Sequence, residues 1–320
     1  MTTVAAIDCG TNSIRLLIST VTPASASDGL PQLTDIVRES RVVRLGYGVD
    51  RTGEFHPDAL ARTVEATEDY ARLIAAHDCQ RVRFVATSAT RDARNRETFI
   101  AGVVAALGVE PEVISGEQEA QLSFVGAISG AARDQPGPYL VADLGGGSTE
   151  LVLGTDRVTA AHSMDIGSVR LTERHLGITD TALRRTSIRA DIEAAIDRAE
   201  ALVHLGQART LIGVAGTVTT VAAHALRLPA YDSKALDGCV IDVDATLAAC
   251  HDLETLDRGS LAALPYVHPG RIDIIGTGAL IWADVIERVR ARVAAQGGEL
   301  NTVMTSEHDI LDGIALSLAE

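Results

Sequence analysis

YLVADLGGGSTELVLG (139–154) repeats the plan of VAAIDCGTNSIRLLIS (4–19) near the start of the chain. In both stretches an apolar strand ends at an aspartate, a turn containing glycine follows, and a second apolar strand leads away. Both turns fit the pattern Asp-x-Gly-x-x-Ser, as Asp8-Cys9-Gly10-Thr11-Asn12-Ser13 and as Asp143-Leu144-Gly145-Gly146-Gly147-Ser148. The repetition predicts two halves that each begin with the same hairpin.

Each turn combines groups that bind phosphate with groups that bind divalent cations. Backbone N–H groups of a glycine-rich turn can point at phosphate oxygens, and an aspartate at a strand end can hold Mg²⁺ directly or through water. One such hairpin is weak evidence, because Asp and Gly are also common turn formers. The pair resembles the duplicated phosphate hairpins of the actin-like ATPase superfamily, which implies an α/β fold with two ribonuclease H-like domains flanking a central cleft.

The rest of the chain fits this organisation. A length of 320 residues predicts about two domains. Strands and helices alternate after the first hairpin, with a helix expected over 57–77, a strand over 81–88 and a helix over 91–107. ARDQPGP (132–138) is a Pro/Gly break between the halves. We expect one domain to comprise 1–125 and 303–320, including a last helix over 306–319, and the other to comprise 126–302.

Composition narrows the class of function. The formal net charge of −15 repels polyanions at long range, and four Phe, five Tyr and one Trp are too few for stacking platforms, so nucleic-acid binding is not expected. The four cysteines show no Cys-x-x-Cys pair, and no apolar run is long enough to cross a membrane. We therefore expect a cytoplasmic protein with reduced thiols and no membrane contact.

Seven blocks, in order along the chain, resemble the exopolyphosphatase/guanosine pentaphosphate phosphatase (Ppx/GppA) family. The resemblance runs nearly end to end and implies the two-domain actin-like fold in its short form, cleavage of phosphoric anhydrides, and a homodimer. The blocks are AAIDCGTNSIRLLI (5–18), ATSATRDARN (86–95), VISGEQEAQLSFVGA (113–127), VADLGGGSTELVLG (141–154), DIGSVRLTE (165–173), GVAGTVTTVAA (213–223) and RIDIIGTGALI (271–281).

The resemblance implies a catalytic carboxylate at Glu119, which precedes Ala120 in the family's Gly-x-Glu-Glu-Ala block. A positioned carboxylate can orient and deprotonate water, a contribution of typically about 10²–10⁴-fold. The preceding glutamate of the family is Gln118 here, so the charge that the family carries at that position is missing. Taken alone, Ser115 followed by Glu117 and Glu119 would equally describe an ordinary acidic helix start.

The resemblance also implies a metal site and a set of phosphate contacts. The metal residues would be Asp143, Glu150 and Asp8, whose hard oxygen ligands suit Mg²⁺ or Mn²⁺. The third glycine-rich turn, at 213–217, offers a helix N-terminus where anions are stabilised. The implied phosphate-binding residues are Gly10, Thr11, Asn12, Ser13, Arg15, Arg91, Asn95, Gly145, Gly146, Gly147, Ser148, Gly216 and Thr217.

The implied activity is release of terminal orthophosphate from inorganic polyphosphate. We expect short chains to be preferred, because a two-domain body with a charge of −15 offers little surface to a long polyanion. Guanosine pentaphosphate 5′-phosphohydrolase is the alternative, although the scarcity of aromatic residues disfavours a purine seat.

Other classes stay open at this point. A non-hydrolytic sensor of polyphosphate or nucleotide would keep both hairpins, and Gln118 and SEHDILDGIA (306–315), where many relatives have Gly-x-Arg-Glu-Gly, are departures that favour it. A sugar or acetate kinase can use the same fold. A Rossmann dehydrogenase is the weakest option, because Gly276-Thr277-Gly278 lacks the third glycine and more readily indicates close packing of a helix on a strand.

Overall fold

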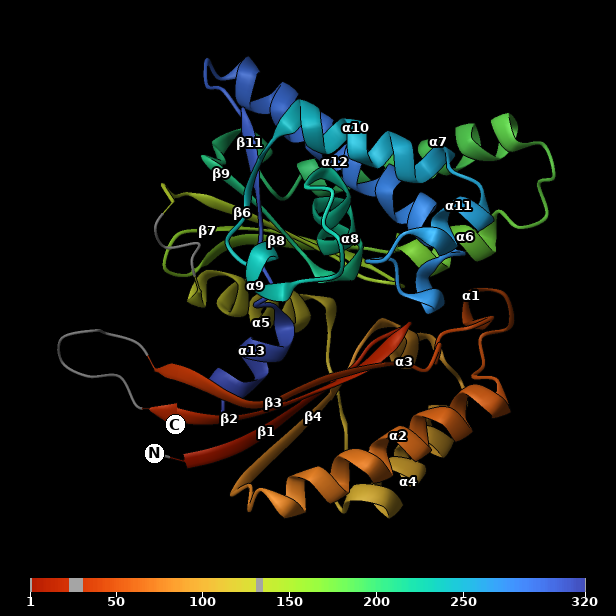
Figure 1. Cartoon of the computed structure of the whole chain (residues 1–320), viewed down its shortest axis with the longest axis vertical. Helices are drawn as coiled ribbons and strands as arrows, with labels where there is room; N and C mark the ends of the chain where they lie inside the picture. The colour runs from red at the N-terminus through yellow and green to blue at the C-terminus, as the bar shows by residue number, and fades with distance from the viewer. Residues whose placement is uncertain (1, 23–30, 131–134, 320) are drawn as a thin grey trace. The chain divides into compact units, whose positions relative to one another are not determined.

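The computed structural model describes residues 2–22, 31–130 and 135–319, in two compact units (Figure 1). The first unit comprises Met1–Gly126 with Ile310–Glu320, and the second comprises Ala127–Asp309. Residues 131–134, at the beginning of the Pro/Gly break, lie outside the described part. Both units combine a mixed β-sheet with helices, which confirms the α/β fold class.

The first unit has a five-stranded sheet in the order β3-β2-β1-β4-β5. Strand β1 is antiparallel to β2 and parallel to β4, and β4 is parallel to β5. The strands are β1 (Thr2–Cys9), β2 (Ser13–Thr22), β3 (Gln32–Val42), β4 (Arg81–Ala86) and β5 (Glu112–Val113). The helices are α1 (Val49–Thr52), α2 (Pro57–Ala76), α3 (Ser88–Asp92), α4 (Arg96–Leu107), α13 (Ile310–Leu316) and the greater part of α5 (Gly116–Ser129).

Both faces of β1 are buried, which explains why this strand reads as a continuous apolar run. Ala5 and Ile7 belong to a core with side chains of α2 and α4, whereas Val4 and Ala6 belong to a second core with side chains of α13. Figure 1 shows α2 and α4 on one side of these strands and α13 on the other. Alternate residues of β1 therefore anchor the two helical layers.

The second unit has a six-stranded sheet in the order β10-β11-β9-β6-β7-β8. Its strands are β6 (Tyr139–Leu144), β7 (Thr149–Gly154), β8 (Val158–Met164), β9 (Thr210–Val214), β10 (Val240–Asp242) and β11 (Thr302–Thr305). Its helices are α6 (Ser168–Arg174), α7 (Thr181–Glu200), α8 (Ala215–Ala225), α9 (Ser233–Leu236), α10 (Val243–Thr255), α11 (Arg258–Ala263) and α12 (Ile275–Ala295), with 3₁₀ turns η2 (Leu205–Gln207) and η3 (Pro269–Arg271).

The main core of the second unit lies between its sheet and the helices α7, α10 and α12. Leu140 and Ala142 of β6 share this core with Ile192 of α7, Leu253 of α10 and Trp282 of α12. All five side chains are almost completely buried. Removing this much apolar surface from water is the main stabilising contribution to the unit.

Two expected helices differ from the structure. The helix expected over 91–107 is two helices, α3 and α4, because Ala93 has an extended backbone and Asn95 stands at the N-cap of α4. The helix expected over 306–319 is shorter, and residues 302–305 form β11 beside β9. Residues 303–309, which we expected in the first domain, lie in the second unit because the β11 pairing draws them there.

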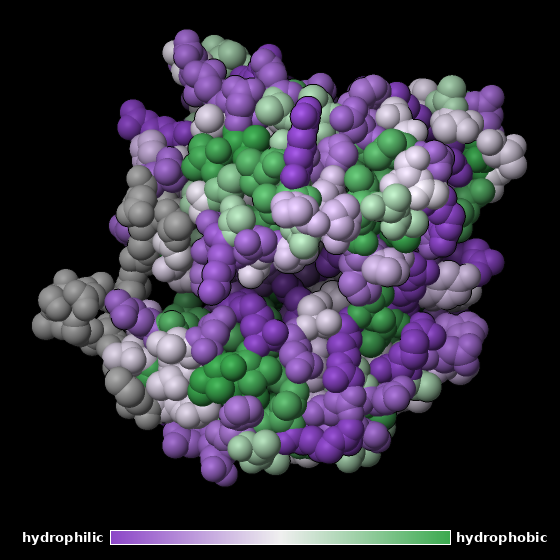
Figure 2. Space-filling view, viewed as in Figure 1, coloured by the Kyte–Doolittle hydropathy of each residue, from purple (hydrophilic) through white to green (hydrophobic). Residues whose placement is uncertain are grey.

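The surface of the protein mixes apolar and hydrophilic side chains (Figure 2). No helix among the described residues is long and apolar enough to span a membrane. Figure 2 shows apolar side chains in separate patches among hydrophilic ones on the face in view. This mixture is usual for protein surfaces, where apolar atoms also contribute much of the accessible area.

We expect a buried ion pair to determine how well α13 is held in the first unit. Asp312 on α13 is completely buried, and its carboxylate accepts from both Nη atoms of Arg38 on β3, at 2.5 and 3.2 Å. Asp312→Ala leaves Arg38 without this buried partner and should lower the free energy of unfolding by about 2 kcal/mol. Urea unfolding followed by circular dichroism measures the loss.

Arg290→Ala is the control for this prediction. Arg290 pairs with Asp244 on the surface, with both side chains largely exposed. Such pairs contribute roughly 0–1 kcal/mol, so the unfolding midpoint should barely move. Equal midpoints for Asp312→Ala and the unaltered protein would contradict the role given to the Arg38 pair.

Candidate functional site

In the first unit, one edge of the sheet collects the polar side chains of three segments. Because β1, β4 and β5 are parallel, their carboxyl ends meet at the same edge, with Cys9 beside Ala86 and Ala86 beside Val113. The chain leaves this edge through the first hairpin, through α3 and through α5. These are the segments in which the sequence places Asp8, Arg91 and Glu119.

The first hairpin closes with a single short turn. Gly10 N–H donates to the Ser13 carbonyl at 2.9 Å, and the register places Asp8 opposite Arg15. The Arg15 guanidinium donates to Asp8 Oδ2 from Nε at 3.0 Å and from Nη2 at 2.6 Å. Asp8 is only 5% exposed, so Arg15 compensates a carboxylate that has been removed from water.

The side chain of Asn12 is buried in the turn of the first hairpin. Its Oδ1 and Nδ2 atoms are buried, and neither has a partner within the described part of the chain. Its backbone carbonyl, in contrast, accepts from Val43 and Arg44 and holds the turn in place. A buried amide without partners costs about 1–3 kcal/mol, so a native structure keeps one where a ligand or water completes it.

Arg91 holds Glu119 in the same cluster. Its Nη1 atom donates to Glu119 Oε2 at 2.7 Å and to the Ile114 carbonyl at 3.0 Å. Arg91 stands in α3 after β4, and Glu119 stands in the first turn of α5 after β5. We expected Arg91 to bind phosphate; its guanidinium donates to Glu119, the carboxylate that we expected to act as base.

The environment of Glu119 favours its protonated form. Burial raises the pKa of the Glu119 carboxyl above its ordinary value, and the nearby Asp8 carboxylate adds to the rise. The positive charge and hydrogen bond of Arg91, with a further hydrogen bond from Thr87, act in the opposite direction. A carboxylate shifted in this way is typical of a general base.

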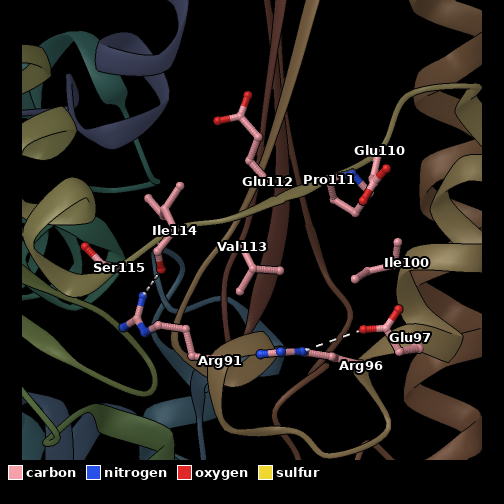
Figure 3. Close-up of a pocket in the computed structure, with 10 residues that line it drawn as sticks. All are labelled: Arg91, Arg96, Glu97, Ile100, Glu110, Pro111, Glu112, Val113, Ile114 and Ser115. Atoms are coloured by element: carbon pink, nitrogen blue, oxygen red, sulfur yellow. Dashed lines mark hydrogen bonds and ion pairs between the residues drawn. The ribbon is translucent and has the colours of Figure 1, made fainter.

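A pocket opens beside Arg91 (Figure 3). Figure 3 shows the Arg91 guanidinium turned toward Ile114 and Ser115, while Arg96 turns to Glu97. The pocket has a volume of about 620 Å³, and its lining includes three glutamates and two arginines. This balance of charge does not suit a polyanion, so we assign no phosphate binding to the pocket, although Arg91 lines it. Its lining residues are Arg91, Arg96, Glu97, Ile100, Glu110, Pro111, Glu112, Val113, Ile114 and Ser115.

The hairpin of the second unit is closed in the same way as the first. Gly145 N–H donates to the Ser148 carbonyl at 3.0 Å, and the register places Asp143 opposite Glu150. Both carboxylates are buried, and Ser163 Oγ donates to Glu150 Oε1 at 2.6 Å. In the first hairpin the residue opposite the aspartate is an arginine, Arg15. In the second hairpin it is a second carboxylate, Glu150. Like charges directly opposite one another repel, which favours a cation between them.

The glycine turn of the second hairpin presents its N–H groups. The Gly145 and Gly146 carbonyls accept from the backbone at the start of α6, and the Gly147 carbonyl accepts from Arg170 Nε at 2.5 Å. In the described structure, no protein group accepts from the N–H of Gly146 or Gly147. With its carbonyls tied back, the turn can offer these donors to phosphate oxygens.

The third glycine-rich turn lies at the same sheet edge of the second unit. Strands β6 and β9 are parallel, with Asp143 beside Val214, and α8 follows β9 directly. A Cβ atom at Gly216 would overlap the guanidinium of Arg271, so this glycine permits the arginine to lie on the first turn of α8. Thr217 is buried there. The second-unit cluster therefore joins Asp143, Glu150 and the two glycine turns.

The donor set fits a hard divalent cation. Within residues 2–22, 31–130 and 135–319, no group of three His, Cys, Asp or Glu side chains is arranged to hold a metal ion. Asp143 and Glu150 supply a pair of carboxylates instead. Mg²⁺ is commonly held by one or two carboxylates, with substrate phosphates and water completing its octahedron.

Asn95, which we expected to bind phosphate, makes hydrogen bonds to the backbone of Phe55. Asn95 Oδ1 accepts from the Phe55 N–H at 2.8 Å, and Asn95 Nδ2 donates to the Phe55 carbonyl at 3.1 Å. Both ends of the amide thus fasten the chain before α2. The Asn95 amide has hydrogen-bond partners in Phe55 at both of its polar atoms.

The helix packing expected at Gly278 has a different partner. A Cβ atom at Gly278 of α12 would press on Thr217 of α8. This glycine therefore permits two helices to approach, where the sequence analysis expected a helix against a strand.

Three residues that contact the two clusters were not predicted individually from the sequence. Thr87 bonds to Glu119, Ser163 bonds to Glu150, and Gly167 lies against the second glycine turn. Gly167 stands inside the block DIGSVRLTE (165–173), which was a usable signal. No sequence motif marks Ser163, because only the register between β7 and β8 brings it to Glu150.

Comparison with known proteins identifies the family. The model of the Ppx/GppA phosphatase family matches residues 23–298. The chain belongs to this family. It is 46% identical over 325 residues to exopolyphosphatase 2 of Mycobacterium tuberculosis, with 100% of this chain and 99% of that protein covered.

Two further relatives place the chain within the Ppx/GppA family. A crystal structure of an exopolyphosphatase-like protein matches with a TM-score of 0.93 and 45% identity, over 99% of both chains. The guanosine-5′-triphosphate,3′-diphosphate pyrophosphatase of Photobacterium profundum is 31% identical over 220 residues, which cover 67% of this chain and 42% of that protein. The family and fold expected from the sequence are confirmed.

Gly167→Ala should disable the second glycine turn. Gly167 has an extended backbone that any residue can adopt, but an added Cβ atom would lie 2.5 Å from the carbonyl group of Gly146. The turn must shift. Displacement of its N–H groups, which we expect to donate hydrogen bonds to phosphate, should reduce orthophosphate release by about tenfold or more. A colorimetric phosphate assay measures the loss.

Gly177→Ala is the matched control, because nothing lies within 4 Å of the added Cβ atom there. It should retain the activity of the unaltered protein. Full activity in Gly167→Ala would show that the geometry of the turn does not matter.

Proposed function

We propose that this protein is an exopolyphosphatase that releases terminal orthophosphate from short inorganic polyphosphate chains. The observation that carries the proposal is Glu119, a buried carboxylate held by Arg91. It lies at the edge of the first sheet where the first hairpin turns from β1 into β2. Full-length similarity to a protein named exopolyphosphatase 2 supports the same reaction. A hydrolase of the Ppx/GppA family has to activate water, and the burial of Glu119 and its contact with Arg91 support this role for it.

Glu119 is the proposed general base. The oxygen of a water molecule attacks the terminal phosphorus, the bond from that phosphorus to the bridging oxygen breaks, and the shortened chain leaves with the electron pair. The water proton passes to Glu119. Arg91 holds one carboxylate oxygen of Glu119 at 2.7 Å, and Thr87 adds a hydrogen bond to the same carboxylate, so that its orientation is held.

The hairpin groups and arginine side chains are proposed to bind the phosphates. The Asn12 amide, buried without partners among the described residues, and the Gly146 and Gly147 N–H groups supply donors, and Arg15 adds positive charge. Positioning and charge neutralisation of this kind account for most of the catalysis in phosphoryl transfer.

Asp143 and Glu150 are proposed to hold Mg²⁺ or Mn²⁺, with Asp8 as a further candidate. The bound ion would neutralise charge on the phosphoryl oxygens. Ser163 fixes one oxygen of Glu150 and thereby orients the carboxylate pair. From the family resemblance we further propose a cytoplasmic homodimer with no nucleic-acid or membrane partner.

A substrate comparison tests the proposal. Orthophosphate release is measured with added Mg²⁺ on a polyphosphate chain-length series and on guanosine pentaphosphate. We expect short polyphosphate to be the best substrate, and Glu119→Gln, which keeps the shape but cannot accept the proton, to reduce kcat by about 10²–10⁴-fold.

The other results of the same assay decide between the alternatives. Faster turnover of guanosine pentaphosphate would make this a guanosine pentaphosphate 5′-phosphohydrolase; the Photobacterium relative is named guanosine-5′-triphosphate,3′-diphosphate pyrophosphatase. Faster turnover of polymers hundreds of units long would remove the proposed chain-length preference. Binding of polyphosphate without any metal-dependent release would leave a sensor, and transfer to added ADP would reveal a kinase.

The pH dependence of the reaction should report Glu119. The base works when deprotonated, so kcat/KM falls as the pH drops through the pKa of Glu119, which burial raises. Arg91 lowers that pKa, and its removal must therefore raise it. We expect the acidic limb of kcat/KM in Arg91→Gln to lie at higher pH than in the unaltered protein.

Arg94→Gln is the control for this measurement. Arg94 is exposed and bonds to the Thr52 carbonyl and Glu54, away from Glu119. Its acidic limb should stay in place. A limb at the same pH in Arg91→Gln and the unaltered protein would mean that Glu119 is not the group seen in the profile.

A further inference from the structure

The short connection between β5 and α5 is tied down at every backbone polar group, beginning with Ile114. Ile114 N–H donates to the Ala86 carbonyl of β4 at 3.1 Å. The Ile114 carbonyl accepts from Arg91 Nη1 at 3.0 Å. The strand end and the arginine that grips Glu119 are thus joined to the same residue.

Ser115, the next residue, is bound entirely by the first turn of α5. Its N–H donates to Gln118 Oε1 at 3.0 Å, and its carbonyl accepts from Glu119 N–H at 2.9 Å. Its hydroxyl accepts from Gln118 N–H at 3.3 Å. Ser115 and Gln118 therefore form a reciprocal capping box, in which each side chain satisfies the backbone of the other.

Glu119 follows directly on this box. Its carboxylate is held on one side by Arg91, and its backbone is held by the helix turn that Gln118 closes. Gln118 and Ser115 themselves are exposed. An exposed cap adjacent to a buried carboxylate can act on the reaction only through the placement of the helix start.

We propose that Gln118 is a positioning residue for Glu119. Through its bond to Ser115, Gln118 closes the N-terminus of α5 and so places the helix turn that carries Glu119. The inference rests on the proposed function of Glu119. Gln and Glu both satisfy the capping box, so the acceptor oxygen is what the position requires. The neutral amide supplies that oxygen without another carboxylate beside Glu119 and Asp8.

The experiment compares variants on short polyphosphate, at a pH on the plateau of the profile. Gln118→Ala removes the acceptor and should lower kcat by about threefold to tenfold with KM unchanged, because the base is misplaced while the phosphate groups are not. Gln118→Glu keeps the acceptor and should restore kcat. Gln121→Ala makes the same change at an exposed position of α5 outside the box and should behave as the unaltered protein.

Ser115→Ala tests whether the two residues act as a pair. It removes the hydroxyl that accepts from Gln118 N–H and should also lower kcat. Because both changes open the same box, the double variant should lose less than the product of the two single losses.

Hydrogen exchange of the Ser115 and Gln118 amides gives a readout independent of activity. Exchange should be faster in Gln118→Ala and return to the original rate in Gln118→Glu. Unaltered kcat in Gln118→Ala, or a loss that Gln118→Glu does not restore, would overturn the inference. Full activity in Glu119→Gln would instead overturn the base assignment, while the exchange rates would still decide whether Gln118 closes the helix.

Discussion

One hydrogen bond in each hairpin, from the glycine N–H to the serine carbonyl, is the constraint on which both clusters depend. Gly10 bonds to Ser13 and Gly145 bonds to Ser148, at 2.9 and 3.0 Å. The bond sets the register of the two strands and so decides which residue stands across from the aspartate. That residue is Arg15 in the first unit and Glu150 in the second. One backbone design thus supports a compensated ion pair in one unit and a pair of carboxylates in the other.

Burial and compensation together determine the chemistry of the first-unit cluster. A carboxylate removed from water becomes a stronger base, but an uncompensated one is costly to keep charged. Arg15 compensates Asp8, and Arg91 compensates Glu119, whose pKa is nonetheless raised because desolvation is the largest effect. The cluster therefore retains a carboxylate whose pKa is raised and whose orientation is held. The connection before α5 adds backbone anchors to the same end.

Much of the first-unit cluster was predictable because its members follow strand ends. Asp8 closes β1 and Arg91 follows β4, and parallel strands carry such residues to one edge. Asn95 lies only four positions beyond Arg91 in sequence, yet its amide fastens Phe55. The break between α3 and α4 sends it elsewhere, and no local pattern distinguishes a hydrogen bond to a distant backbone from a hydrogen bond to phosphate. For the same reason Thr87 and Ser163 were recognised only as neighbours of Glu119 and Glu150 in space.

The amino-acid sequence by itself determined the duplicated hairpins, the α/β class and the Ppx/GppA family, because these depend on strand patterning, turn residues and ordered blocks that can be read locally. Tertiary structure decided that Arg91 holds Glu119, that residues 303–309 join the second unit through β11, and that Gly167 must lack a side chain beside Gly146. Each of these results depends on a close approach between segments distant in the chain. Such approaches are set by strand register and packing, which no short stretch of residues encodes alone.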